Sequence, residues 1–317
     1  MSSLIARTLR RVAETLRRPP WLARRLVEVM RLVPGRSLRS KLYLVFSWPL
    51  SEDLRTRFRA RTVAGPMLVD PQTMMGRVLT VSGEWEPHVT AAFLGRLAAG
   101  DVCVDVGAHI GYYTLLAAGA VGPAGSVYAL EPSARVFETL TTNLALNECD
   151  NVSALRLAAG SEAGEAVLFE APGPSPLTSS LSPRMLEAPH GGRAQEFVPR
   201  QVSVAPLDGV VPADVHARVR VVKIDVEGYE VEVLRGMERL LSTGGPIAVF
   251  VETSPEWANE DPAAFLTDLC RRHGLSPYVV QNDYSLDGYF PQRLLPPVPV
   301  TTIPAERRDL MLVRDGR

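Results

Sequence analysis

The sequence has few cysteines and no long apolar run. Its three cysteines, Cys103, Cys149 and Cys270, are widely spaced and form no C-x-x-C pair. This number and spacing argue against a disulfide framework or a zinc site and fit a reducing compartment. No uncharged apolar stretch approaches the ~18 residues that span a bilayer, and the basic N-terminus lacks the apolar core of a signal peptide. We therefore expect a cytoplasmic protein.

Lysine is nearly absent, and the positive charge is unevenly distributed. Lys41 and Lys223 are the only lysines among 34 basic residues, and the net charge of −1 argues against a nucleic-acid partner. Residues 1–41 nevertheless carry ten arginines and one lysine against two glutamates, in the pattern of amphipathic helices. Such helices bind anionic membranes. Two hypotheses remain for residues 1–40: peripheral membrane contact, or docking on the main domain with solvated arginines.

The length of 317 residues and the hydrophobic content of 46% suit one large domain with an extension. We predict a basic helical extension over residues 1–60 and one α/β domain over residues 61–317. A stretch rich in proline, serine and glycine predicts a long loop or insert at about 160–218. Before the regular part of the domain, residues 77–83 are predicted to form a strand and residues 86–100 a helix.

Strand and helix patterns then alternate along the chain. The predicted strands are 102–106, 126–131, 152–157, 219–226, 246–252, 276–281 and 309–314, with further strand pattern at 196–207. The predicted helices are 111–120, 134–146, 229–241 and 262–273. This alternation indicates a parallel sheet covered by helices. Ligands bind such sheets beyond the carboxyl ends of the strands, so residues at these ends are the candidate site residues.

The first of these strands ends in a D-x-G-x-x-x-G motif over residues 105–111, and the second ends at Glu131. An acidic residue at the end of the second strand can hydrogen-bond the hydroxyls of a ribose. A nicotinamide dinucleotide fits poorly, because His109 replaces the middle glycine of its motif and Asp105 would repel a pyrophosphate. S-adenosylmethionine has a sulfonium, an ammonium and a ribose but no phosphate, so it suits an anionic pocket. A nicotinamide-dependent oxidoreductase remains an alternative.

Several segments in the same order carry a resemblance to a known family. They are "GEWEPHV", "GDVCVDVGAHIGYYTLLAA", "VYALEPS", "NLALN" and "VKIDVEGYEVEVLRG". Over roughly residues 80–255 they resemble the FkbM family of S-adenosylmethionine-dependent O-methyltransferases, which usually has Asn where His109 stands. The resemblance implies a Rossmann-like class I methyltransferase sheet, mostly parallel with an antiparallel strand near the C-terminus and helices on both faces. It also implies methyl transfer to a hydroxyl of a sugar, glycolipid or polyketide-type natural product.

The resemblance further implies roles for individual residues. Asp225 and Glu227, after the fourth strand, would face the acceptor oxygen, and Glu131 would hold the ribose. The residues that would bind the cofactor are Asp105, Gly107, Ala108, His109, Gly111, Glu131 and Pro132.

The chemistry of methyl transfer explains charges at the end of a buried strand. Side chains alternate along a strand, so Lys223, Asp225 and Glu227 share one face, and Lys223 is expected to pair with a carboxylate. An alcohol is a poor nucleophile while it keeps its proton, and a nearby carboxylate can accept that proton. Alternatively, Mg²⁺ held by Asp225 and Glu252 would lower the pKa of the alcohol. The competing structural role of Asp225 and Glu227 is capping of the next helix.

Other hypotheses concern assembly and a role without catalysis. The chain could form a homodimer, or it could keep a cofactor fold without activity while the basic arm tethers it to a membrane or a partner enzyme. The loop at 171–200 is predicted to close over the acceptor, with Trp257 as an apolar wall for a sugar ring.

Overall fold

The computed structural model describes residues 58–171, 179–182, 197–253, 255, 258, 260–282, 285–291 and 293–316. Residues 1–57 of the predicted extension, most of the predicted loop at 171–200, and Trp257 lie outside these ranges. The chain divides into two compact units, Met1–Pro87 with Asp283–Leu294 and His88–Asn282 with Leu295–Arg317. No helix in the described part of the chain has the length and apolar character needed to cross a bilayer.

The first unit contains a hairpin of β1 (Phe58–Thr62) and β2 (Gly65–Val69) and the helices α4 (Met74–Ser82) and α12 (Leu286–Tyr289). The prediction of a strand at 77–83 is wrong, because these residues belong to α4. Thr73 Oγ1 accepts a hydrogen bond from Gly76 N at 2.9 Å and caps the helix, and Gly83 ends it at φ 76°. A short apolar run does not distinguish a buried helix from a strand, and here the caps at both ends favour the helix.

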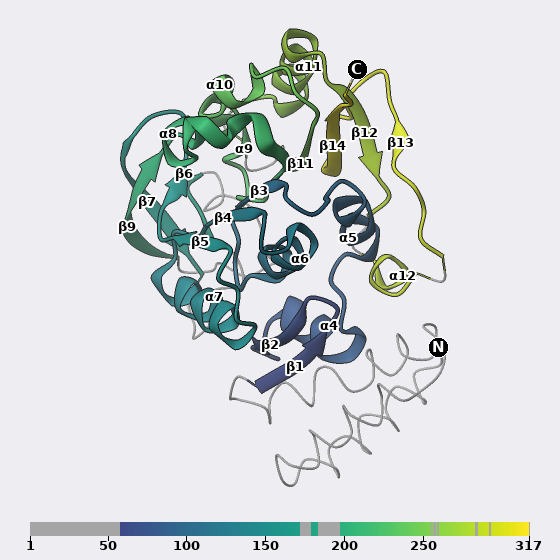
Figure 1. The fold of residues 1–317 in the computed structure, drawn as a ribbon. Helices are drawn as coiled ribbons and strands as arrows, with labels where there is room; N and C mark the ends of the chain where they lie inside the picture. The colour runs from purple at the N-terminus through teal and green to yellow at the C-terminus, as the bar shows by residue number, and fades with distance from the viewer. Residues whose placement is uncertain are drawn as a thin grey trace, which may run out of the picture. The chain divides into compact units, whose positions relative to one another are not determined.

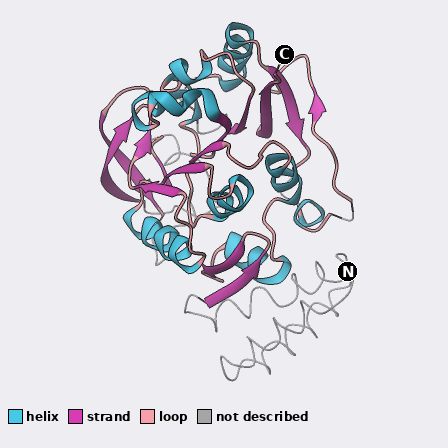
Figure 2. Ribbon diagram, in the orientation of Figure 1, coloured by secondary structure: helices cyan, strands magenta, loops and turns pink. Residues whose placement is uncertain are grey.

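The second unit is built on an eight-stranded sheet in the order β13-β12-β14-β11-β10-β3-β4-β5 (Figures 1 and 2). From β5 through β11 the strands are parallel, whereas β14 runs antiparallel to both β11 and β12. The predicted Rossmann-like sheet, mostly parallel with an antiparallel strand near the C-terminus, is confirmed. Its strands are β3 (Val102–Val106), β4 (Ser126–Leu130), β5 (Val152–Leu155), β10 (Val219–Ile224), β11 (Ile247–Thr253), β12 (Ser276–Val280), β13 (Val298–Pro299) and β14 (Arg308–Arg314).

Helices cover both faces of this sheet. In Figure 1, α6 lies below β3 and β4, and α9 lies above them. Alternation along the strands sorts their side chains: Val104 and Val222 join the buried apolar core formed with α9, α10 and α11. Phe250 lies on the opposite face, with its ring 5.8 Å from that of Phe93 in α5. The helices are α5 (Pro87–Leu94), α6 (Tyr112–Val121), α7 (Ala134–Leu146), α9 (Glu230–Arg235), α10 (Glu238–Leu241) and α11 (Pro262–His273).

Two predicted helices differ from the observed ones. The helix predicted to end at Gly100 ends at Leu94. The helix predicted over 229–241 is divided into α9 and α10 at Gly236, where an added Cβ would lie 2.0 Å from Gly160 O. The chain therefore packs closely against a neighbouring backbone at this point, which only glycine allows.

The predicted loop or insert at about 160–218 holds most of a second sheet, of which the strand over residues 164–170 was not predicted. The sheet has the order β6-β9-β7-β8, and β7 pairs antiparallel with β9 along seven residues of each strand. The strand pattern at 196–207 is confirmed by β9. The elements of the insert are β6 (Ala158–Ala159), β7 (Gly164–Glu170), β8 (Ser179–Ser180), β9 (Val198–Ala205), α8 (Leu207–Val210) and the 3₁₀-helix η2 (Ala213–Arg218).

Candidate functional site

The chain changes direction between the neighbouring strands β3 and β10. After β3 it continues to β4 and β5, and after β10 it continues to β11 on the other side. Open parallel sheets bind ligands beyond the carboxyl ends of strands at such a split. Asp105 pairs in register with Lys223, so the turns that follow the two strands also meet. A Cβ added to Gly107, at φ 77°, would lie 1.9 Å from Asp225 O.

The turn after β3 folds back onto the end of β4. The backbone N–H groups of Gly107 and Ala108 both donate to Leu130 O, at 3.0 and 2.9 Å. The fully buried Asn143 of α7 donates from Nδ2 to Ile110 O at 2.8 Å. The asparagine that begins the "NLALN" segment therefore holds the glycine-containing turn in place.

Glu131 lies directly after β4 and is in contact with this turn. Its buried carboxylate accepts hydrogen bonds from His109 N at 3.0 Å and from Ser133 N at 2.8 Å. Burial raises the pKa of Glu131 to about 7 despite these bonds. His109 is half-buried at φ 51°, and burial lowers its pKa. The structure thus brings the predicted ribose-binding acid to the predicted cofactor turn, and each carboxylate oxygen keeps a second acceptor position.

Asp105 faces α6 from the centre of the sheet. It is 2% exposed, and its Oδ2 accepts a hydrogen bond from Thr114 Oγ1 at 2.6 Å. Burial raises the pKa of Asp105 to about 6, although this bond and the charge of Lys223 act in the opposite direction. Sequence reasoning did not identify Thr114. The sequence could have indicated Thr114, because it lies in the first turn of the helix that follows Gly111.

Lys223 is a buried ammonium that is bound on two sides. Its Nζ lies 2.8 Å from Asp225 Oδ2 and 4.6 Å from the centre of the Tyr113 ring. Burial raises the pKa of Asp225, but the charge and hydrogen bond of Lys223 outweigh this effect and hold the pKa below its ordinary value. The predicted pairing of Lys223 with a carboxylate is confirmed. Capping does not explain Asp225, because α9 begins only at Glu230.

Glu227 occupies a strained position in the loop after β10. Its backbone lies in the left-handed region, at φ 55°. The side chain is one-quarter exposed, but Oε2 is buried, accepts no hydrogen bond within the described residues, and lies 3.9 Å from Arg307 Nη2. Burial, and then the charge of Asp225, raise the pKa of Glu227 to about 8. Strain of this kind in a non-glycine residue is often found at functional sites.

Arg307 places a positive charge between the carboxyl groups of Glu227 and Glu252. The Arg307 guanidinium, just before β14, hydrogen-bonds the buried carboxylate of Glu252. Within the described residues, no group of three or more His, Cys, Asp or Glu side chains could hold a metal ion. The predicted Mg²⁺ at Asp225 and Glu252 does not fit, because each carboxylate is already paired with a basic side chain.

Two further contacts fix the loop that carries Glu227. The buried carboxylate of Glu230 accepts a hydrogen bond from Gly228 N at 2.9 Å, and burial raises the pKa of Glu230 to about 7. Ser180, within the loop predicted at 171–200, donates from Oγ to Glu227 O at 2.5 Å. Sequence reasoning identified neither residue.

Acidic groups outnumber basic groups around the split between β3 and β10. Among the described residues, Lys223 pairs with Asp225, and Arg307 lies near Glu227 and Glu252, while three more carboxyl groups belong to the same region. Once ionised, carboxyl groups in this number favour a cationic ligand over a diphosphate. The carboxyl groups are those of Asp105, Glu131, Asp225, Glu227, Glu230 and Glu252.

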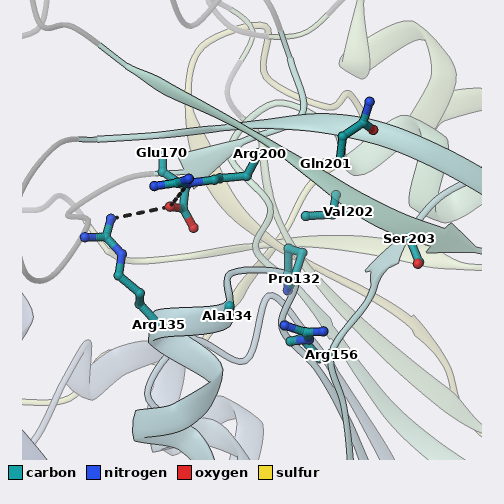
Figure 3. A pocket seen from close by; sticks show the side chains of 9 residues that line it. All are labelled: Pro132, Ala134, Arg135, Arg156, Glu170, Arg200, Gln201, Val202 and Ser203. Carbon is teal, nitrogen blue, oxygen red and sulfur yellow. Dashed lines mark hydrogen bonds and ion pairs between the residues drawn. The ribbon is translucent and has the colours of Figure 1, made fainter.

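Pro132, the last predicted cofactor residue, lines a cavity of about 310 Å³ next to the second sheet. Figure 3 shows it with Arg135, Arg156, Glu170 and Arg200 around the cavity. The residue that follows Glu131 thus lines a basic cavity.

Curated proteins and solved structures similar to this chain include several methyltransferases. "Methyltransferase 1" of Beauveria bassiana is 33% identical over 146 residues, which are 43% of this chain and 57% of that protein. "Hexuronic acid methyltransferase AglP" of Haloferax volcanii is 30% identical over 158 residues, 50% of this chain and 59% of that protein. The structure of methyltransferase FkbM from Methylobacillus flagellatus KT aligns with a TM-score of 0.39 at 16% identity, covering 92% of this chain and 58% of that one.

The alignments cover only part of the curated relatives, between 57% and 63% of their length. The model of one family, the Methyltransferase FkbM domain, matches residues 105–275. The match begins at the acid of the glycine motif, includes Asp225 and Glu252, and covers more than half of the 317 residues. On that extent, the chain belongs to the Methyltransferase FkbM domain family.

Proposed function

We propose that the chain is an S-adenosylmethionine-dependent O-methyltransferase that acts on a hydroxyl of a sugar, glycolipid or polyketide-type natural product. The observation that carries the proposal is a pair of carboxyl groups, Asp225 and Glu227, with oppositely shifted pKa values beside the glycine turn. Family membership supports methyl transfer, and the hexuronic acid methyltransferase among the relatives supports a sugar-type acceptor.

The residues around the turn fit the cofactor. S-adenosylmethionine, when bound, supplies a methyl group on a positively charged sulfur. Asp105 and the turn over residues 107–111 would hold its methionine end, and the free acceptor positions of Glu131 would receive the ribose hydroxyls. The excess of carboxyl groups fits a cationic ligand that lacks phosphate.

The two carboxyl groups after β10 have separate roles in this proposal. Lys223 keeps Asp225 ionised and fixes its position. Glu227, with a pKa of about 8, is a much stronger base than Asp225 once it is ionised. We assign proton removal from the acceptor hydroxyl to Glu227 and charge stabilisation to Asp225. Groups whose environments push their pKa values apart commonly divide acid–base roles in this way.

Mass spectrometry of methyl transfer from CD₃-labelled S-adenosylmethionine to a panel of hydroxylated compounds tests the proposal. We expect Glu227→Gln to lower kcat by about 10²–10⁴-fold, the usual contribution of a general base, and to leave the cofactor Kd within twofold in titration calorimetry. Glu165→Gln, an exposed position on β7, is the matched control and should keep full activity. Full turnover by Glu227→Gln would refute its assignment as the base.

A further inference from the structure

A basic cavity lies between the ends of β4 and β5 and the second sheet, separate from the acidic site (Figure 3). Three arginines line it: Arg135 in the first turn of α7, Arg156 directly after β5, and Arg200 on β9. Glu170, at the end of β7, is the acidic residue among those that line it. This cavity has no part in the mechanism above.

The described residues that line the cavity carry more basic than acidic groups. The carboxylate of Glu170 is 4% exposed and lies 3.4 Å from Arg135 Nη2 and 3.6 Å from Arg200 Nε. Figure 3 shows both guanidinium groups directed toward this one carboxylate, with Arg156 apart from them. Arg156 forms no ion pair or hydrogen bond within the described residues. Among the described residues that line the cavity, one carboxylate thus stands against three guanidinium groups.

The start of α7 adds to this positive potential. Pro132, Ala134 and Arg135 line the cavity where the helix begins. The N-cap residue Ser133 makes no side-chain capping hydrogen bond, so the first-turn N–H groups are not capped by a side chain. The N-terminus of a 13-residue helix carries a partial positive charge that favours anions.

The position of the cavity relates it to the reacting groups. Pro132 and Arg156 follow β4 and β5, at the same carboxyl edge of the sheet as Glu227, which follows β10. Three strand spacings separate β5 from β10, and at ~4.8 Å each they give roughly 14 Å. A molecule the size of a disaccharide or larger covers this distance.

We propose that this cavity binds a phosphate or carboxylate group carried by the methyl acceptor, so that the enzyme selects acidic acceptors. Guanidinium groups bind both anions through two parallel hydrogen bonds. The assignment to the acceptor rests on the proposed methyltransferase function, whereas the assignment of an anion site does not.

Binding of inorganic phosphate and pyrophosphate to the full chain, measured by titration calorimetry, tests the anion site. We expect Arg156→Ala to weaken binding at least tenfold. Glu170→Gln removes the competing carboxylate and should strengthen binding. Arg271→Ala, an exposed position on α11, is the control and should bind as the wild type does. Wild-type protein that binds neither anion, or a folded Arg156→Ala that binds as well as wild type, overturns the site.

Paired acceptors then test where the anion comes from. Sugar phosphates and uronic acid glycosides are compared with their neutral counterparts, with transfer of the CD₃ group as the readout. We expect at least tenfold higher kcat/KM for the acidic members, a difference that Arg156→Ala removes without slowing the neutral members. Phosphate binding without a preference for acidic acceptors would contradict the acceptor assignment and leave a site for a free anion. A weaker S-adenosylmethionine Kd in Arg156→Ala would assign the arginine to the cofactor and overturn the proposal.

A failure of the proposed function gives a different result. In that case the chain binds no S-adenosylmethionine and transfers no methyl group, while phosphate binding still responds to Arg156→Ala and Glu170→Gln. That outcome contradicts the acceptor assignment and upholds the anion site.

Discussion

Lys223 Nζ lies 2.8 Å from Asp225 Oδ2 at the carboxyl end of β10. The lysine side chain is 4% exposed and the aspartate side chain is 30% exposed. The ammonium therefore depends on this carboxylate and on the Tyr113 ring for stabilisation, whereas the carboxylate still reaches solvent. The pair therefore combines a buried ammonium with a carboxylate that solvent reaches.

Breaking this pair should destabilise the fold. We expect Lys223→Met to lower the free energy of unfolding by about 2–3 kcal/mol, below the ~3–5 kcal/mol of a fully buried pair because Asp225 is partly solvated. The double variant Lys223→Met/Asp225→Asn should recover part of the loss, since no unpaired charge remains. Urea denaturation at pH 7 measures both. Arg96→Met, which breaks the exposed pair with Asp315, is the control and should cost under about 1 kcal/mol. Equal losses in Lys223→Met and in the control would contradict the buried-pair interpretation.

The pH dependence of turnover should follow Glu227. With a pKa of about 8, the ionised base is scarce at pH 6, so kcat/KM should rise with pH, reach half its maximum near pH 8 and level off about one pH unit higher. Asp225→Asn removes a negative charge that raises this pKa and should shift the titration of Glu227 to lower pH. Arg307→Gln removes a positive charge and should shift it upward. Carboxyl ¹³C NMR of glutamate-labelled protein measures the titration even in inactive variants, and unchanged midpoints would show that the three groups are not coupled.

Stability of the free protein should fall as the pH rises from about 5 to 8. Burial raises the pKa of Asp105 from 3.8 to about 6, and those of Glu131 and Glu230 from 4.5 to about 7. The folded state therefore holds more protons than the unfolded state, and the stabilisation present below pH 4 is lost as the pH passes the folded pKa values. Thermal unfolding across this range measures the effect. Glu131→Gln should flatten the decline, and a Tm that increases steadily to pH 8 would contradict it.

Binding of a cationic cofactor should release protons. S-adenosylmethionine favours the ionised forms of Asp105 and Glu131, so at pH 6–7 part of the bound protons must leave on binding. Calorimetric titration in two buffers of different ionisation enthalpy gives the number released. We expect a positive release at pH 6.5 that vanishes near pH 9. A release that does not change with pH would mean that these two carboxyl groups do not contact the ligand.

Two glycine substitutions should have opposite effects on stability. Gly107→Ala places a Cβ 1.9 Å from Asp225 O at φ 77°, and should cost at least about 2 kcal/mol from strain and displacement. Gly119→Ala, in the last turn of α6 where an added Cβ meets nothing within 4 Å outside the helix backbone, is the control and should stabilise by up to about 0.5–1 kcal/mol. Chemical denaturation compares them, and a neutral Gly107→Ala would show that the turns after β3 and β10 do not touch.

The sequence alone was enough to predict the repeating strand–helix order and the residues at the strand ends. Buried strands such as β3 and β11 are apolar runs with one acidic residue near the carboxyl end, Asp105 and Glu252. Because parallel strands end at one edge, Asp105, Glu131 and Asp225 could be assigned to a common site before any coordinate was known. The pairing of Lys223 with Asp225 was predictable for the same local reason, a spacing of two residues.

Contacts between distant segments were decided only by the tertiary structure. Arg307 contacts Glu252, which is 55 residues away in the sequence, and Thr114 contacts Asp105, nine residues away. The pairing of β7 with β9 forms most of the second sheet, which contributes residues to the basic cavity. Such contacts depend on strand order, register and helix rotation, which local periodicity does not encode. The sequence therefore determined which strand ends meet at the site, and the tertiary structure decided which cations reach it and where a separate anion can bind.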